Sequence, residues 1–102
     1  MASAEPTIDH DRIRQWAEAR RGQPARVKGR DILRLDFPGY SGEDTLEPIS
    51  WEDWFRVFDE NRLAILLQDR KEDGEPSTFN KLVDRGTVAS ELRGSSTARA
   101  RG

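Results

Sequence analysis

Apolar side chains recur at helical spacing in two separate segments of the chain, and each segment follows a residue that can cap a helix. In the first, Ile13, Trp16 and Ala17 fall at i, i+3 and i+4, so they lie on one face of a helix. Asp9 is the expected N-cap, and Ile8 before it can pack against Ile13. We predict an amphipathic helix that begins after Asp9 and ends at the following Gly-Gln-Pro sequence.

The second segment repeats this pattern near the middle of the chain. Ser50 is the expected N-cap, Asp53 stands at the N3 position of a capping box, and Ile49 can pack against Trp54. Burying the aromatic stripe that follows is the most direct source of stability for so small a domain, so we assign it to the core. The stripe contains Trp51, Trp54, Phe55 and Phe58.

Residues 25–37 are predicted to form a β-hairpin around Gly29, and the apolar pattern favours one of two registers. A two-residue turn would pair Val27 with Ile32 and scatter apolar side chains over both faces of the hairpin. A three-residue loop pairs Val27 with Leu33 and gathers these side chains on one face. We expect the second register, which leaves the other face of the hairpin strongly charged.

The second half of the chain contains one clear strand and one ambiguous segment. Residues 63–68 are apolar up to the last position and too short for a helix, which predicts a strand buried on both faces at the centre of a sheet. Residues 79–83 fit a helical turn, but they also fit a hairpin that returns through the Asp-Gly at 73–74. The pattern slightly favours a short helix or an irregular segment.

Together these elements predict an α+β fold in one small domain, with two helices packed on a three-stranded, mostly antiparallel sheet. The domain spans residues 8–85 and contains a Gly- and Pro-rich loop at 38–44. Residues 1–7 are expected to be a flexible leader. Residues 86–102 contain few large apolar side chains and are expected to be a disordered tail.

Length and composition exclude several classes of protein. A chain of 102 residues is too short for an eight-stranded barrel enzyme of roughly 250 residues. The lack of cysteine excludes disulfides, thiolate zinc sites and iron–sulfur clusters. The N-terminus lacks the basic and apolar regions of a secretory signal, and the longest apolar run is far shorter than a membrane span. We therefore expect a cytoplasmic protein that starts at Met1 and does not bind membranes.

The sequence contains no arrangement typical of an enzyme or a metal site. The single histidine lies in Asp9-His10-Asp11, where successive helical side chains diverge by about 100° and cannot converge on one ion. No nucleophile triad or glycine-rich phosphate loop is present, and the acidic pairs at 43–44 and 59–60 lie in segments with surface character. We predict no catalytic residues, no cofactor and no metal. An enzyme would need an acidic residue of segment 36–44 buried in a cleft.

Charge is distributed unevenly, although the formal net charge is only −2. Segment 20–34 contains six basic residues and one acidic residue, whereas segment 36–60 contains eight acidic residues and one basic residue. The two segments can offset each other as an ordinary solvated surface, or they can form a dipolar docking surface.

The best candidate for function is the charged face of the predicted hairpin, supported by two aromatic residues at its rim. Its cations could hold an acidic protein surface or the phosphates of a nucleic acid. The candidate binding residues are Arg26, Lys28, Arg30, Arg34, Tyr40 and Trp51. Because the chain is acidic overall, we expect a non-enzymatic protein-interaction or accessory module with an acidic protein partner. A weak nucleic-acid-binding module is the alternative.

Four stretches of the chain form a recognisable set: Asp-His-Asp-Arg-Ile-Arg-Gln-Trp-Ala-Glu (9–18), Leu-Arg-Leu-Asp-Phe-Pro-Gly-Tyr-Ser-Gly (33–42), Ile-Ser-Trp (49–51) and Phe-Asn-Lys-Leu-Val (79–83). This set resembles a family of small uncharacterised bacterial proteins. Some members of that family carry the description 1,4-alpha-glucan branching enzyme, but this chemistry needs a barrel far larger than the present chain. The resemblance therefore implies no catalytic residues.

Overall fold

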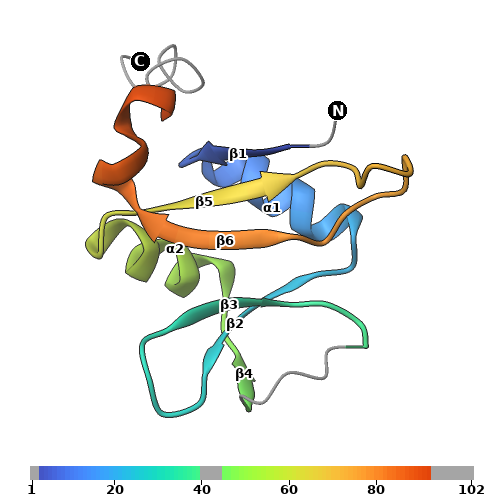
Figure 1. The fold of residues 1–102 in the computed structure, drawn as a ribbon. Helices are drawn as coiled ribbons and strands as arrows, with labels where there is room; N and C mark the ends of the chain where they lie inside the picture. The colour runs from blue at the N-terminus through green and yellow to red at the C-terminus, as the bar shows by residue number, and fades with distance from the viewer. Residues whose placement is uncertain (1–2, 40–44, 93–102) are drawn as a thin grey trace.

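The computed structural model describes residues 3–39 and 45–92, and Figure 1 shows how its elements are arranged. The fold is a small α+β domain, as the sequence predicts. Within the described ranges, no helix is both long enough and apolar enough to cross a membrane. The elements are, in order, β1 (Ala4–Thr7), α1 (His10–Ala19), β2 (Gln23–Val27), β3 (Leu33–Asp36), β4 (Leu46–Pro48), α2 (Trp51–Glu60), β5 (Leu63–Gln68), β6 (Asn80–Asp84) and the 3-10 helix η1 (Arg85–Val88).

The strands form two sheets and not the single sheet expected from the sequence. One sheet has the order β1-β5-β6 and the other has the order β3-β2-β4, and all strand pairs are antiparallel. β5 lies at the centre of the first sheet, which confirms the prediction for residues 63–68. The prediction missed β1, β4 and β6 because these short sequences become strands only when a partner strand pairs with them.

The expected flexible leader contains a strand. Residues 4–7 form β1, which pairs with β5 so that Glu5 lies opposite Leu67. Thr7 is buried, and its hydroxyl accepts a hydrogen bond of 3.1 Å from the Asp9 amide. This strand has little sequence signal, because it is short, contains a proline and has no apolar alternation of its own.

The expected disordered tail also begins with ordered residues. η1 ends at Val88, and helical turns continue to residue 92. Leu92 is only 7% exposed, so a large apolar side chain of this segment is buried against the domain. The prediction of disorder rested on the composition of the whole segment, and one buried leucine changes that composition very little. The remainder of the predicted tail, residues 93–102, lies outside the described part.

Residues 79–83 do not form the short helix that the pattern slightly favoured. β6 pairs with β5 along its length, with Leu82 opposite Ile65. The chain returns to the sheet through a turn at Gly74, whose φ of 90° is readily adopted by glycine. Five residues fit a helical turn and a strand equally well, and pairing with β5 decides between them.

The hairpin of β2 and β3 adopts the register that the sequence analysis rejected. The Val27 amide donates to the Ile32 carbonyl at 2.9 Å, and Arg26 takes the place opposite Leu33 that was predicted for Val27. The prediction assumed that only one face of the hairpin is buried. In the structure, Leu33 is buried in the main core, whereas Ala25 is buried on the opposite face of the same sheet.

Both helices begin where the capping signals predict. The Asp9 side chain accepts hydrogen bonds from the amides of Asp11 and Arg12, at 3.1 and 3.4 Å. The Ser50 hydroxyl accepts a hydrogen bond of 3.0 Å from the Asp53 amide. These local contacts satisfy amides that have no partner within the helix, so the two starts are set by the sequence itself.

The main core lies between the two helices and the inner faces of the two sheets. Trp54 and Phe58 of α2 are fully buried, and their rings stack at 5.3 Å. The buried members of the core are Ile13, Trp16, Ala17, Leu33, Leu35, Trp54, Phe58, Ile65 and Leu67. They come from α1, β3, α2 and β5, so the predicted helical stripes and the central strand do form one core.

The two helices end on arginines in the left-handed backbone region, where glycine is usually found. Arg21 has φ 62° and Arg62 has φ 52°. Gly22 follows Arg21, but its role is close packing, because a Cβ at this position would lie 2.6 Å from the Phe37 ring. The sequence prediction assigned the end of the first helix to the glycine, whereas the left-handed residue is the preceding arginine.

Replacing Arg21 or Arg62 by glycine is expected to stabilise the domain. Each substitution relieves a left-handed strain of roughly 1–2 kcal/mol and adds a smaller entropic cost, which leaves a gain of about 0.5–1 kcal/mol. The gain is measured as a higher midpoint in urea unfolding. Arg30→Gly, at an exposed arginine without positive φ, is the control and should give no gain. A lower urea midpoint for both glycine variants would contradict the assignment of backbone strain to Arg21 and Arg62.

Candidate functional site

The four cations predicted to share one hairpin face are divided between two faces. In the observed register, Arg26 lies opposite Leu33 of β3 and Glu47 of β4. Arg34 lies opposite Ala25, one position along β2, and therefore projects to the other side of the sheet. The predicted single basic face is thus not formed, because its geometry depended on the three-residue loop.

Arg26 is held by carboxylates on its own side of the sheet. Its Nε lies 3.2 Å from Glu47 Oε1, and its Nη1 lies 3.7 Å from Asp31 Oδ1. It lines a polar cavity of about 210 Å³ between the hairpin and α2. The other arginine of this cavity, Arg56, is similarly placed near the carboxylates of its own helix. Neighbouring acidic groups therefore neutralise both arginines, which leaves them poorly suited to hold phosphates.

Lys28 and Arg30 lie at the exposed tip of the hairpin. The tip is ordered by backbone hydrogen bonds, because the Lys28 amide donates to the Thr45 carbonyl at 2.8 Å and the Arg30 amide donates to the Val27 carbonyl at 2.9 Å. Within residues 3–39 and 45–92, neither side chain is in an ion pair. These two cations are therefore available to a partner in a way that Arg26 is not.

The face of the β3-β2-β4 sheet that points away from the main core combines apolar residues with the polar residues Gln23, Arg34 and Asp36; we call it the outer face. On β2 it carries Ala25 and Val27, which lie opposite Pro48 and Leu46 of β4. Ile32 continues this row at the tip, where the Val27 amide donates to its carbonyl, and its side chain is 38% exposed. Arg34 borders the row from β3, and its Nη1 donates to the Leu33 carbonyl at 3.1 Å.

The outer face was missed by the sequence analysis, although the signal for it was present. The rejected register placed Val27 and Ile32 together on the face opposite Leu33 and Leu35, and these are the positions they occupy. An apolar second face was treated as evidence against that register. On this second face Ile32 is 38% exposed, whereas Ala25 and Val27 are buried, so both faces of the sheet bury apolar side chains.

Of the two aromatic candidates, Trp51 does not extend this surface. Tyr40 lies outside the described residues. Trp51 is half-buried, and its ring stacks on Phe55 at 5.3 Å and meets Trp54 edge-on at 5.7 Å. Trp51 therefore uses its ring inside the aromatic group of α2.

His10 is part of a structural contact between the two helices. Its ring stacks on Phe55 at 4.1 Å, and its Nε2 lies 2.9 Å from Asp59 Oδ2. Asp59 also lies 2.9 Å from Arg85 Nη2. No group of three or more potential metal ligands occurs in the described ranges, so the contact joins helices and does not gather ligands.

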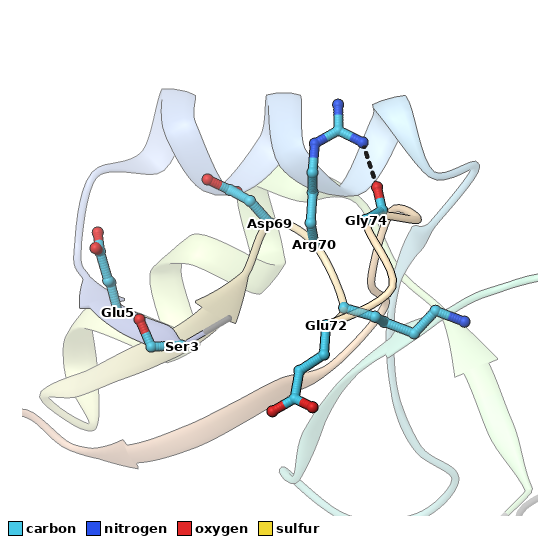
Figure 2. A pocket seen from close by; sticks show the side chains of 7 residues that line it. Ser3, Glu5, Asp69, Arg70, Glu72 and Gly74 are labelled. Atoms are coloured by element: carbon cyan, nitrogen blue, oxygen red, sulfur yellow. Dashed lines mark hydrogen bonds between the residues drawn. The ribbon is translucent and has the colours of Figure 1, made fainter. Parts of the chain in front are cut away.

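A wide hollow of the surface lies between β1 and the turn that joins β5 to β6 (Figure 2). It has a volume of about 730 Å³ and is wide open. Figure 2 shows Arg70 turned back onto the turn, where its Nη1 donates to the Gly74 carbonyl at 2.8 Å. The carboxylates of Glu5, Asp69 and Glu72 are exposed, so nothing in the hollow excludes water from a ligand or fixes its orientation.

Buried polar chemistry is sparse in the part of the chain that the structure describes. Its buried polar side chains are Thr7 and Ser77, and the Ser77 hydroxyl donates to Gln68 Oε1 at 2.6 Å. No protein-family model, no curated protein and no solved structure matches the chain. The function is therefore argued from the surfaces of this chain alone.

Proposed function

We propose that this chain is a non-catalytic protein-interaction domain that binds an acidic, partly apolar protein segment on its outer face. The observation that carries the proposal is the register of β2 and β3, which puts Val27, Ile32 and Leu46 on the face away from the core. Of these three side chains, Ile32 is 38% exposed, Leu46 is half-buried and Val27 is buried. Protein-binding surfaces commonly combine an exposed apolar side chain with a charged rim.

The charges at the hairpin tip favour an acidic partner. Lys28 and Arg30 lie at the same tip as the exposed Ile32. An acidic segment would gain attraction from these cations while its apolar side chains cover Ile32. Phosphates alone would gain nothing from Ile32, and Arg26 is already held by Glu47. The combination therefore favours a protein over a nucleic acid.

The test is an amide chemical-shift titration of the full chain with three probes at low and moderate salt. The probes are a peptide that alternates glutamate pairs with leucine, a short single-stranded DNA and a short double-stranded DNA. We expect the peptide to shift the amides of residues 25–34 and of Leu46 and Glu47. Shifts from both DNAs that exceed those from the peptide and fade steeply with salt would overturn the proposal in favour of phosphate binding.

Matched variants separate the apolar contribution of Ile32 to peptide binding from the contribution of the charges of Lys28 and Arg30. Ile32→Asp is expected to weaken peptide binding about ten-fold, because it removes an apolar contact and adds a like charge. Lys28→Glu/Arg30→Glu should weaken it similarly, whereas Lys71→Glu/Arg62→Glu changes the net charge equally at exposed positions away from the outer face. Equal losses for the two double variants would mean that only net charge matters, which contradicts a defined surface.

A further inference from the structure

β6 forms an edge of the β1-β5-β6 sheet and has unpaired backbone groups along its free side. The Gln68 amide donates to the Phe79 carbonyl at 3.3 Å, which fixes which residues face β5. In an antiparallel pair, the backbone groups of successive residues point alternately toward the partner strand and away from it. Lys81 and Val83 therefore also bond toward β5. The N–H and C=O groups of Asn80 and Leu82 point outward. Within the described residues β6 pairs with no strand except β5.

The opposite edge of the same sheet is closed to a further strand. The β1 register places Glu5 and Thr7 in the hydrogen-bonded positions toward β5, so the outward positions are Ala4 and Pro6. Proline has no N–H to donate, and it commonly protects edge strands from pairing. β6 contains no proline. The sheet therefore has one protected edge and one edge that can accept a strand.

The side chains of β6 indicate which strand would fit. Phe79, just before β6, is 49% exposed, and Lys81 on the same face is exposed and in no ion pair within the described ranges. An added strand would place one residue opposite Lys81 and others opposite Phe79 and Val83. An acidic residue suits the first position, and apolar residues suit the other two.

A second copy of this chain fits the edge less well. Antiparallel pairing of β6 with itself about Leu82 would bring Lys81 of one copy diagonally beside Lys81 of the other. That pairing would also place the lysine near Arg85 of the second copy, and like charges at such distances destabilise strand pairs. Charge complementarity therefore favours an acidic strand from a different protein.

We infer that β6 is a docking edge for an extended peptide that adds to the sheet as an antiparallel strand, with a carboxylate facing Lys81 and apolar side chains facing Phe79 and Val83. Backbone hydrogen bonds to Asn80 and Leu82 would supply the attachment, and the alternate side chains would supply the specificity. This edge belongs to a different sheet from the outer face, so the inference does not rest on the proposed function.

The probe is an acetylated and amidated peptide of sequence Thr-Val-Thr-Glu-Thr-Val-Thr, added to the full chain. We expect amide shifts centred on Asn80 and Leu82, together with slower hydrogen exchange of the Leu82 amide. A peptide with lysine in place of glutamate should bind about five-fold more weakly, because it places like charges opposite each other. No shift at β6 with either peptide at millimolar concentration, or shifts confined to other surfaces, would overturn the inference.

Two variants test the contacts directly. Asn80→Pro removes an outward N–H while leaving the hydrogen bonds to β5 in place, and it should abolish binding. Lys81→Glu should invert the preference, so that the lysine peptide binds more tightly than the glutamate peptide. This inversion tests the inference even if Asn80→Pro does not fold. Shifts at β6 that depend on protein concentration without peptide would identify a second copy as the occupant and overturn it.

The outer-face variant Lys28→Glu/Arg30→Glu is the control for independence. It should leave the binding of the glutamate peptide at β6 unchanged, because the hairpin tip and β6 belong to different sheets. If this variant weakens binding as strongly as Asn80→Pro does, then the two surfaces are one site and the inference of a separate docking edge is wrong.

Discussion

Replacing Trp54 by alanine is expected to destabilise the domain by about 3–5 kcal/mol, as removal of a fully buried tryptophan generally does. Trp54 has no exposed surface, and its ring stacks on Phe58 at 5.3 Å. Its Nε1 donates a hydrogen bond of 3.0 Å to the Arg34 carbonyl on β3. The side chain thus fixes α2 to the β3-β2-β4 sheet, while Phe58 and Ile65 connect the same core to the other sheet.

A loss of this size is comparable to the whole stability of a small domain, about 5–15 kcal/mol. The Trp54→Ala variant should therefore be partly unfolded at physiological temperature, with a much lower urea midpoint measured by circular dichroism. Trp54→Phe keeps most of the ring but loses the N–H donor, so we expect a smaller loss of about 1–2 kcal/mol.

Trp51→Ala is the matched control for this prediction. Trp51 belongs to the same helix and the same aromatic group, but it is only half-buried. Within the described residues its indole N–H has no counterpart to the hydrogen bond from Trp54 Nε1 to the Arg34 carbonyl. Replacing Trp51 by alanine should lower the free energy of unfolding clearly less than replacing Trp54 does. If the two alanine variants have equal midpoints, or if their order is reversed, the central role assigned to Trp54 is wrong.

Arg20→Met is expected to cost about 2–3 kcal/mol, because hydrogen bonds from a charged group to several partly buried carbonyls are lost together. Arg20 donates from Nε to the Ser77 carbonyl, from Nη1 to the Trp16 carbonyl at 3.0 Å, and from Nη2 to the Asp69 carbonyl at 2.7 Å. Its guanidinium carbon also lies 4.3 Å from the centre of the Trp16 ring. The side chain therefore joins the end of α1 to both ends of the β5-β6 connection.

The environment of Arg20 is consistent with this structural role. Desolvation lowers the pKa of Arg20, and the charge of Asp69 acts in the opposite direction. Methionine preserves the apolar stem that covers Trp16 but provides no donors. Arg20→Lys should recover only part of the loss, because a compact ammonium group cannot match the planar fork of the guanidinium.

The measurement for Arg20 is the free energy of unfolding in urea, with Arg14→Met as the control. Arg14 is exposed on the same helix, and its one ion pair among the described residues is with Glu18, four residues along, so its loss should cost less than about 0.5 kcal/mol. Equal effects of Arg20→Met and Arg14→Met would show that the contacts with the β5-β6 connection contribute no stability. If Arg20→Lys has the same free energy of unfolding as the unchanged chain, then the positive charge alone accounts for the stabilising effect of Arg20.

The predicted binding residues illustrate how one long-range choice affects a whole site. The sequence predicts a hairpin that contains these cations, but their arrangement depends on the register. Moving the pairing by one residue places Arg26 beside Glu47 and Arg34 on the opposite face. The same change places Val27 and Ile32 together on the outer face, where Ile32 is 38% exposed and Val27 is buried.

Local signals in the sequence determined the two helix starts, the aromatic stripe and the central strand. Asp9 and Ser50 cap helices through contacts within three residues, and the run at 63–68 is apolar enough to be buried on both sides. Such features depend on neighbours along the chain, so a sequence pattern is sufficient to predict them.

Only the tertiary structure decided which segments became β1, β4 and β6, which register the hairpin adopts, and where Arg20 is bound. These features depend on partners far along the chain: β1 pairs with β5, and Arg20 donates to carbonyls at Asp69 and Ser77. A short strand has too little apolar surface to be stable or recognisable alone, and its hydrogen bonds are made with a partner strand. Strand pairing and burial therefore determine these elements, whereas local signals determine where the two helices begin.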